Sequence, residues 1–85
     1  MTLTLIDDQE ATLDVAELTT TLTEAARTGA TVAITYVHPR NGRTARIVRP
    51  RRLANNGDVI RVWDVVRDDY RSFRLDRIAS VDVIS

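Results

Sequence analysis

The hydrophobic positions between residues 14 and 29 follow the pattern of an amphipathic helix. Apolar side chains fall on one helical face, at Val15, Leu18, Leu22, Ala25 and Ala26. Asp14 and Glu17 have the spacing of a capping box, and Gly29 fits the left-handed position that ends a helix. Threonine, a weak helix former, occupies four of the five positions 19–23, so we expect this helix to depend on tertiary packing.

After residue 30 the hydrophobic period falls from that of a helix to the period of two that is typical of strands. We predict strands at residues 31–37, 44–48, 59–66, 70–75 and 81–84, with a short helical turn at 76–79. Pro50 cannot donate a ladder hydrogen bond, so it should lie at a strand end, an edge or a bulge. The order predicts one mainly β domain of the α+β class over residues 1–85, with a helix at 14–29 and a small β-barrel at 31–85. Residues 1–13 are expected to form a turn and a short edge strand at 2–6.

The residue types that support common catalytic chemistry are scarce. The chain has no cysteine and a single histidine, His38, in a predicted loop. No carboxylate cluster has metal-ligand spacing, and no serine has an evident base partner. We therefore expect a non-enzyme with no metal and no cofactor. The N-terminus lacks the features of a signal peptide, and no apolar run could span a membrane, which favours a soluble cytoplasmic protein.

Charge is distributed unevenly along a chain whose formal net charge is zero. Residues 1–30 carry six acidic side chains and one arginine, whereas residues 31–85 carry eleven arginines and six acidic side chains. Residues 38–52 alone contain six arginines and no acid. A basic surface of this kind is typical of proteins that bind anions, often nucleic acid. All twelve basic side chains are arginine, whose planar guanidinium suits bidentate contacts with phosphate. A GC-rich genome would also favour arginine over lysine.

Strand alternation places several arginines beside large apolar side chains. Arg46, Arg61 and Arg71 each share a strand face with such groups. Arginine beside an exposed aromatic ring can hold phosphates while bases stack on the ring. The candidates for such a stacking ring are whichever of the following side chains is exposed: Tyr36, Tyr70, Phe73 or Trp63. We expect Trp63 and Phe73 to lie in the core instead, because five strands need a buried face.

Residues 31–84 resemble the WYL domain of bacterial regulators. The resemblance rests on Ile34-Thr35-Tyr36, on Arg-Ile-Val-Arg-Pro at 46–50 followed by Leu53 and Gly57, and above all on Arg-Ser-Phe-Arg-Leu-Asp-Arg-Ile at 71–78. The last run is similar to the family pattern Arg-x-Phe-Arg-Leu-Asp-Arg-Ile. The tripeptide that names the family is missing, since Asp-Val-Ile stands near its place at 58–60.

The resemblance implies an Sm-like or SH3-like five-stranded antiparallel barrel with a helix packed at one end. Family members occur in transcription regulators and CRISPR accessory proteins, and some are thought to bind single-stranded DNA or RNA, or nucleotide-like ligands. Matched positions imply a binding site at Arg46, Arg71, Arg74 and Arg77, with Tyr36 and Phe73 nearby. Charge and strand geometry add Arg52 and Arg61. Asp76 is expected either to orient neighbouring arginines through paired hydrogen bonds or to cap the turn at 76–79.

Two classes of function follow from these features. The first is a regulatory module, bacterial or phage-encoded, that binds single-stranded nucleic acid or a nucleotide through its arginines. The second is a protein-interaction module, in which acidic and basic surfaces pair in a homodimer or with a partner regulator. In either case the acidic residues of positions 1–10 could fold over the arginines and neutralise them.

Overall fold

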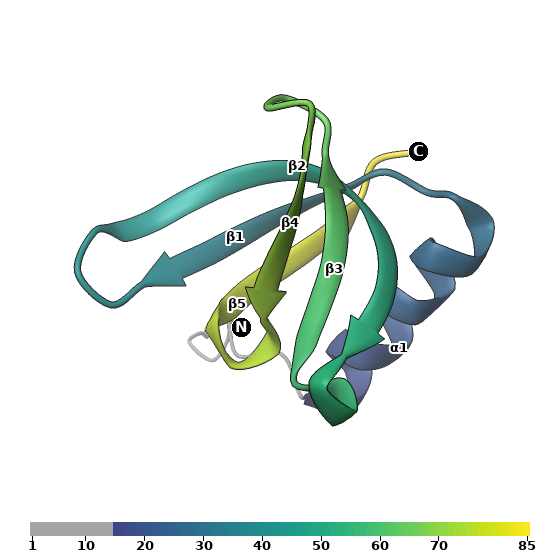
Figure 1. Cartoon of the computed structure of the whole chain (residues 1–85), viewed down its shortest axis with the longest axis horizontal. Coiled ribbons are helices and arrows are strands. Elements are labelled where there is room, and N and C mark those ends of the chain that lie inside the picture. Colours follow the sequence, from purple (N-terminus) through teal and green to yellow (C-terminus); the bar gives the residue numbers. More distant parts are fainter. Residues whose placement is uncertain (1–14) are drawn as a thin grey trace, which may run out of the picture.

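The computed structural model of the chain describes residues 15–85, which form one helix and a five-stranded antiparallel sheet (Figure 1). Two 3-10 turns, η2 and η3, connect strands that follow each other along the chain. In chain order the elements are α1 (Val15–Thr28), β1 (Val32–His38), β2 (Gly42–Ala54), η2 (Asn55–Gly57), β3 (Val59–Asp64), β4 (Asp69–Arg74), η3 (Leu75–Arg77) and β5 (Ile78–Val83). All five strands predicted beyond residue 30 are therefore present, and η3 lies close to the predicted turn at 76–79.

Helix α1 buries the predicted apolar face against the sheet. Leu18, Leu22 and Ala25 are buried, whereas Val15 is 58% exposed, contrary to prediction, because it lies in the first turn at the end of the helix. Gly29 has a φ of 75° and the Ala30 N–H donates to the Ala25 carbonyl at 2.9 Å, which confirms the predicted left-handed helix end. The predicted strand at 2–6 and the cap at position 14 lie outside the described residues.

The sheet has the order β4-β3-β2-β1-β5, and β2 is the strand that shapes it. The first half of β2 pairs with β1, ending at Val48 opposite Val32, and its second half pairs with β3 from Val48 to Ala54. No ladder joins β4 to β5 within residues 15–85, so the sheet is not closed and the predicted barrel is not confirmed. Strand β2 is much longer than the predicted 44–48, because Pro50 is accommodated at a bulge instead of ending the strand.

The core lies between α1 and the concave face of the sheet. Its members come from every strand and from η3, and include Leu22, Val32, Ile34, Val48, Ile60, Val62, Phe73 and Leu75. Phe73 lies in the core as predicted. Trp63 does not, because Val62 on the same strand faces the core, and alternation turns Trp63 to the opposite face, where it is half-buried. We call this opposite face the outer face.

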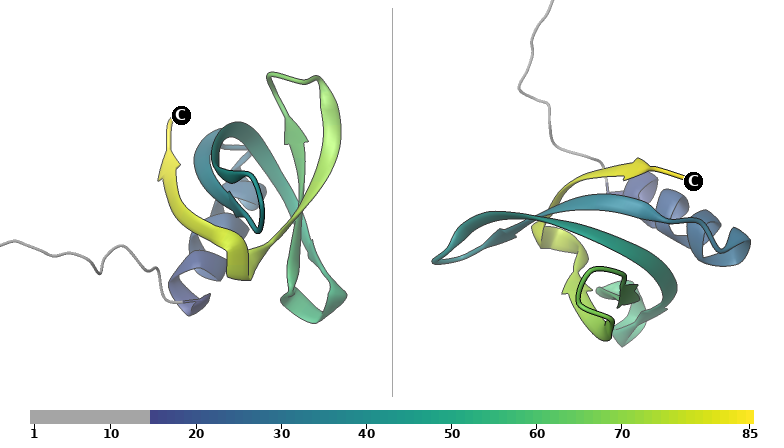
Figure 2. Two further views of the ribbon diagram at one scale, coloured as in Figure 1. Left: turned by 90° about the vertical axis from the view of Figure 1, so that its left-hand side faces the viewer. Right: turned by 90° about the horizontal axis from the view of Figure 1, so that it is seen from above.

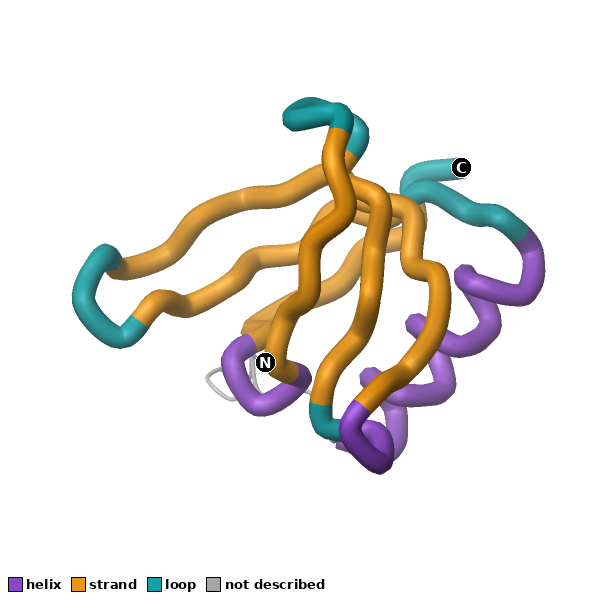
Figure 3. The backbone as a smooth tube through the Cα atoms, in the orientation of Figure 1, coloured by secondary structure: helices purple, strands orange, loops and turns teal. Residues whose placement is uncertain are grey.

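The elements leave different parts of the sheet accessible. The β1–β2 hairpin extends away from α1 and beyond the other strands (Figures 1 and 2). The turn between β3 and β4 lies at the opposite end of these strands from η2 and η3 (Figure 3). No helix among the described residues is both long and apolar enough to cross a membrane.

Candidate anion-binding site

A β-bulge in β2 sets the position of the arginines near the middle of the sheet. Pro50 pairs with Val62 and Arg52 pairs with Arg61, so Arg51 is an extra residue with no partner position in β3. Proline lacks the N–H that a regular ladder would use there, which explains why the irregularity falls at this point. The bulge breaks the strict alternation of side chains, so two consecutive arginines, Arg51 and Arg52, come to line the same hollow.

This outer hollow is lined by Arg51, Arg52, Arg61 and Tyr70, and has a volume of about 290 Å³. Tyr70 lies opposite Trp63 across β3 and β4, with the ring centroids 4.8 Å apart in an edge-to-face arrangement. The guanidinium carbon of Arg51 lies 5.9 Å from the centre of the Tyr70 ring. Because Tyr70 is still 52% exposed, part of its ring remains accessible to a ligand.

The arginines of the outer hollow carry uncompensated charge. Arg52 and Arg61 lie directly opposite each other on neighbouring strands, and like charges in that position destabilise a sheet. Within residues 15–85 the ion pairs are formed by other arginines, namely Arg27, Arg46 and Arg74. An anion placed between Arg52 and Arg61 would relieve their repulsion, so the hollow has the electrostatic character of an anion site.

Arg46 takes part in an internal interaction. Its Nη1 lies 3.5 Å from Oδ2 of Asp64, a carboxylate that is completely buried. The guanidinium carbon of Arg46 also lies 5.8 Å from the centre of the Phe73 ring. The Arg46 side chain is only 11% exposed, so little of it is available to a ligand at the surface. Its Nε is buried without a hydrogen-bond partner within the described part of the chain.

Tyr36 and Phe73 pack against each other in the core. Their ring centroids are 4.7 Å apart, and they are 7% and 4% exposed. The Tyr36 hydroxyl accepts a hydrogen bond of 3.3 Å from the backbone N–H of Arg74. Neither ring presents a face on which a base could stack, so in this arrangement the exposed Tyr70 is the better stacking group.

The remaining predicted residues surround the end of β4. Arg71 lies opposite Val62, so it belongs to the core-facing side of the sheet and is exposed because β4 is an edge strand. Arg74 donates two hydrogen bonds to the carboxylate of Asp76, at 3.1 and 2.8 Å, which is the first of the two alternatives expected for Asp76. This hydrogen bonding lowers the pKa of Asp76 and raises that of Arg74. Arg77 is exposed at the end of η3.

The predicted residues therefore do not form one site. The structure brings Arg52 and Arg61 together, buries Arg46, Tyr36 and Phe73, and places the others, Arg71, Arg74 and Arg77, around β4 and η3. Sequence reasoning did not single out Arg51 or Asp64. The Arg-Pro-Arg-Arg run at 49–52 contained a signal for Arg51, since a proline within a strand indicates a bulge. No local pattern indicated that Asp64 would be buried.

Comparison with known proteins agrees with this architecture. The chain is similar to the proteasome accessory factor B/C (PafBC) of Arthrobacter aurescens, with a TM-score of 0.73 and 26% sequence identity over 92% of the chain. The chain spans only 13% of the length of that protein. No curated protein matches the sequence. The WYL domain family model matches residues 17–83, which include α1 from its first turn and all five strands. The chain belongs to the WYL domain family.

Proposed function

We propose that this chain is a non-enzymatic regulatory module that binds single-stranded nucleic acid or a nucleotide at the outer hollow. The observation that carries the proposal is the position of Arg52 directly opposite Arg61, with no ion-pair partner for either among residues 15–85. Two cations that face each other destabilise the sheet by mutual repulsion. A phosphate bound between them would remove this repulsion and form charge-assisted hydrogen bonds, and both effects favour binding. A cytoplasmic location and the absence of a cofactor are parts of the same proposal.

The aromatic side chains favour a nucleotide over a simple inorganic anion. Tyr70 borders the hollow and is half exposed, and Trp63 supports its ring from the side. Every base has a flat face that can stack on such a ring, independent of sequence. The hollow is open and its polar lining consists of arginines and one phenol, which suits a flexible single strand better than a rigid duplex.

Family membership supports the regulatory part of the proposal. The WYL assignment and the similarity to a proteasome accessory factor suggest a ligand-sensing module. In such a module the bound ligand would change how the domain contacts a neighbouring domain or partner protein. The Sm-like barrel expected from the resemblance would require the two edges of the sheet, β4 and β5, to approach each other.

A protein-interaction module is the second candidate, and exposed apolar side chains favour it. Val83 and Ile84, at the end of edge strand β5 and just beyond it, are 58% and 54% exposed. Edge strands with exposed apolar groups can pair with another chain. A second copy or a partner regulator would cover this edge. The two candidates differ in the partner they require, so one binding experiment separates them.

The test is fluorescence anisotropy with labelled single-stranded DNA, single-stranded RNA and duplex DNA at low and moderate salt. We expect both single strands to bind more tightly than the duplex. The logarithm of the association constant should fall linearly with the logarithm of salt concentration, by about 0.7 for each phosphate contact. No binding to any of the three, together with self-association in sedimentation, would contradict the proposal and support the interaction module.

A further inference from the structure

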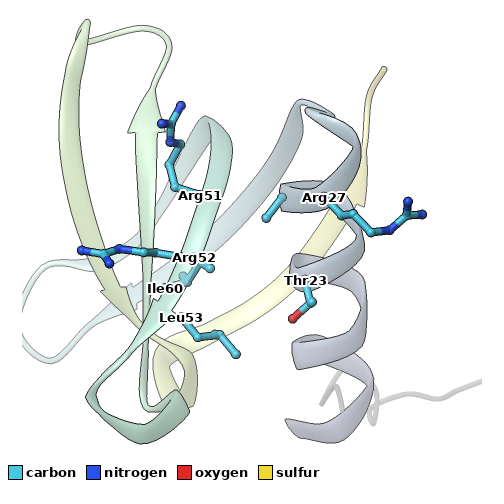
Figure 4. A pocket seen from close by; sticks show the side chains of 7 residues that line it. Thr23, Arg27, Arg51, Arg52, Leu53 and Ile60 are labelled. Atoms are coloured by element: carbon cyan, nitrogen blue, oxygen red, sulfur yellow. The ribbon is translucent and has the colours of Figure 1, made fainter.

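A second concavity lies between α1 and the second half of β2 (Figure 4). We call it the helix–strand groove. It has a volume of about 400 Å³ and is lined by Thr23, Ala26, Arg27, Arg51, Arg52, Leu53 and Ile60. Neither the family resemblance nor the charge pattern pointed to this place, since only its arginines stand out in the sequence.

The groove exists because β2 changes partners along its length. Pairing with β1 ends at Val48, and within the described residues β3 is the only strand that pairs with positions 49–54. The other edge of this segment faces α1, which packs beside β2 without forming a ladder. An unpaired strand edge presents backbone N–H and C=O groups. The groove thus combines an apolar floor with a polar strand edge.

The helix–strand groove is apolar on one side and positively charged on the other. Ala26, Leu53 and Ile60 supply an aliphatic surface, and Thr23 adds one hydroxyl near its side. Although Arg27 borders the groove, its guanidinium points away from β2 and pairs with Glu24 (Figure 4). The positive charge that remains for a ligand comes from Arg51 and Arg52. A ligand that fits must place an apolar body against α1 and an anionic group at β2.

Arg51 and Arg52 line both the helix–strand groove and the outer hollow. In Figure 4 the Arg52 side chain extends from β2 toward β3 and β4, whereas Leu53 points toward α1. The bulge in β2 is therefore a cationic ridge with one concavity on each side. One side offers an aromatic ring, that of Tyr70, and the other offers an aliphatic floor.

We infer that the ligand is at least two nucleotides long and lies across the ridge at Arg51 and Arg52. The bridging phosphate contacts these arginines, one base stacks on Tyr70, and the adjacent base enters the helix–strand groove. This inference rests on the proposed function and adds the length of the ligand and a second base site. The flat face of a base suits the apolar floor, and its polar edge can reach the Thr23 hydroxyl and the free edge of β2.

The test compares a mononucleotide, a dinucleotide with one bridging phosphate, and the same dinucleotide with one abasic sugar, by isothermal titration calorimetry. The variant Ala26→Leu narrows the groove while keeping a good helix former, and Ala16→Leu makes the same change at an exposed position of α1. For the wild type we expect the intact dinucleotide to bind about 5-fold to 150-fold more tightly than the mononucleotide, the range set by stacking one further base.

We expect Ala26→Leu to reduce dinucleotide affinity to the level of the abasic ligand and to leave mononucleotide affinity unchanged, with Ala16→Leu matching the wild type. Thr23→Leu, on the same wall, provides a second narrowing variant should Ala26→Leu unfold. Dinucleotide binding that is insensitive to both groove variants would overturn this inference and leave the proposed function standing. Failure of all three nucleotides to bind would overturn the proposed function as well.

Discussion

Asp64 is completely buried in β3, and its carboxylate holds Arg46 of β2 at 3.5 Å while also accepting the backbone N–H groups of Val66 and Arg67 at 3.1 and 3.0 Å. One side chain therefore joins two strands and fixes the start of the β3–β4 turn. The interaction explains why a positively charged residue can lie beside Phe73 at the margin of the core. It also assigns Arg46 a structural role that its position in the arginine-rich segment did not indicate.

Replacing Asp64 by alanine should destabilise the fold strongly. The change removes two backbone hydrogen bonds and leaves the Arg46 guanidinium largely buried without its counter-ion, and breaking such a pair costs about 3–5 kcal/mol. Chemical denaturation followed by circular dichroism measures the free energy of unfolding. Asp64→Asn keeps a hydrogen-bond acceptor for the turn, so its free energy of unfolding should fall by less than that of Asp64→Ala. A loss below about 1 kcal/mol in Asp64→Ala would show that the pair contributes little.

Removing Arg52 and Arg61 together should separate binding from stability. We expect Arg52→Ala/Arg61→Ala to lose most of the affinity for single strands and to reduce the salt slope by about 1.4, equivalent to two phosphate contacts. Stability should be unchanged or improved by about 0.2–1 kcal/mol, because the two like charges face each other. Anisotropy titrations and denaturation measure the two effects.

The matched control is Arg40→Ala/Arg43→Ala, which removes the same charge near the tip of the β1–β2 hairpin, away from the outer hollow. If both double variants weaken binding equally, the effect arises from net charge and not from a defined site.

Arg71 and Arg74 provide a direct comparison between sequence and structure. The family pattern predicts that Arg71→Ala/Arg74→Ala abolishes ligand binding without unfolding the domain. The geometry predicts a smaller loss than Arg52→Ala/Arg61→Ala causes, because Arg74 is held by Asp76 and Arg71 lies on the other side of the sheet. The same anisotropy titration ranks the two double variants. The reverse ranking would move the site from β2 and β3 to the end of β4.

The Arg74–Asp76 pair should contribute a pH-dependent part of the stability. The hydrogen bonds from Arg74 lower the pKa of Asp76 below its ordinary value of 3.8. A carboxylate with a lowered pKa stabilises the folded state above its unfolded pKa and loses that contribution as the pH falls through the folded pKa. Urea denaturation at several pH values from neutral to acidic should show wild type and Asp76→Asn differing above pH 3.8 and converging below it.

The difference between wild type and Asp76→Asn should be small, since the pair is exposed and screened by solvent. Asp82→Asn on β5 is the control, because Asp82 is exposed and forms no ion pair within residues 15–85. A constant difference between wild type and Asp76→Asn across the whole pH range would contradict the role of this carboxylate.

Local patterns determined most of the secondary structure. The helix ending at Gly29 and the five strands in their order follow from side-chain periodicity and turn residues, which are properties of short segments. The concentration of arginine after residue 30 likewise predicted a basic surface, because charge is a property of composition. The run at 71–78 carried enough specific residues to indicate the family that the comparison confirmed.

Tertiary structure decided which arginines could serve a ligand. Alternation along a strand shows which residues share a face, but the partners that cover that face come from distant parts of the chain. Asp64 and Phe73 thus made Arg46 an internal residue, and Trp63 faces outward because its neighbour Val62 lies in the core. Pro50 indicated a bulge, but the bulge lies in the part of β2 that has left β1 and pairs with β3, and no short segment encodes that change of partner. The ridge between the outer hollow and the helix–strand groove therefore depends on long-range strand pairing. The sequence alone showed only that arginines are concentrated in this segment.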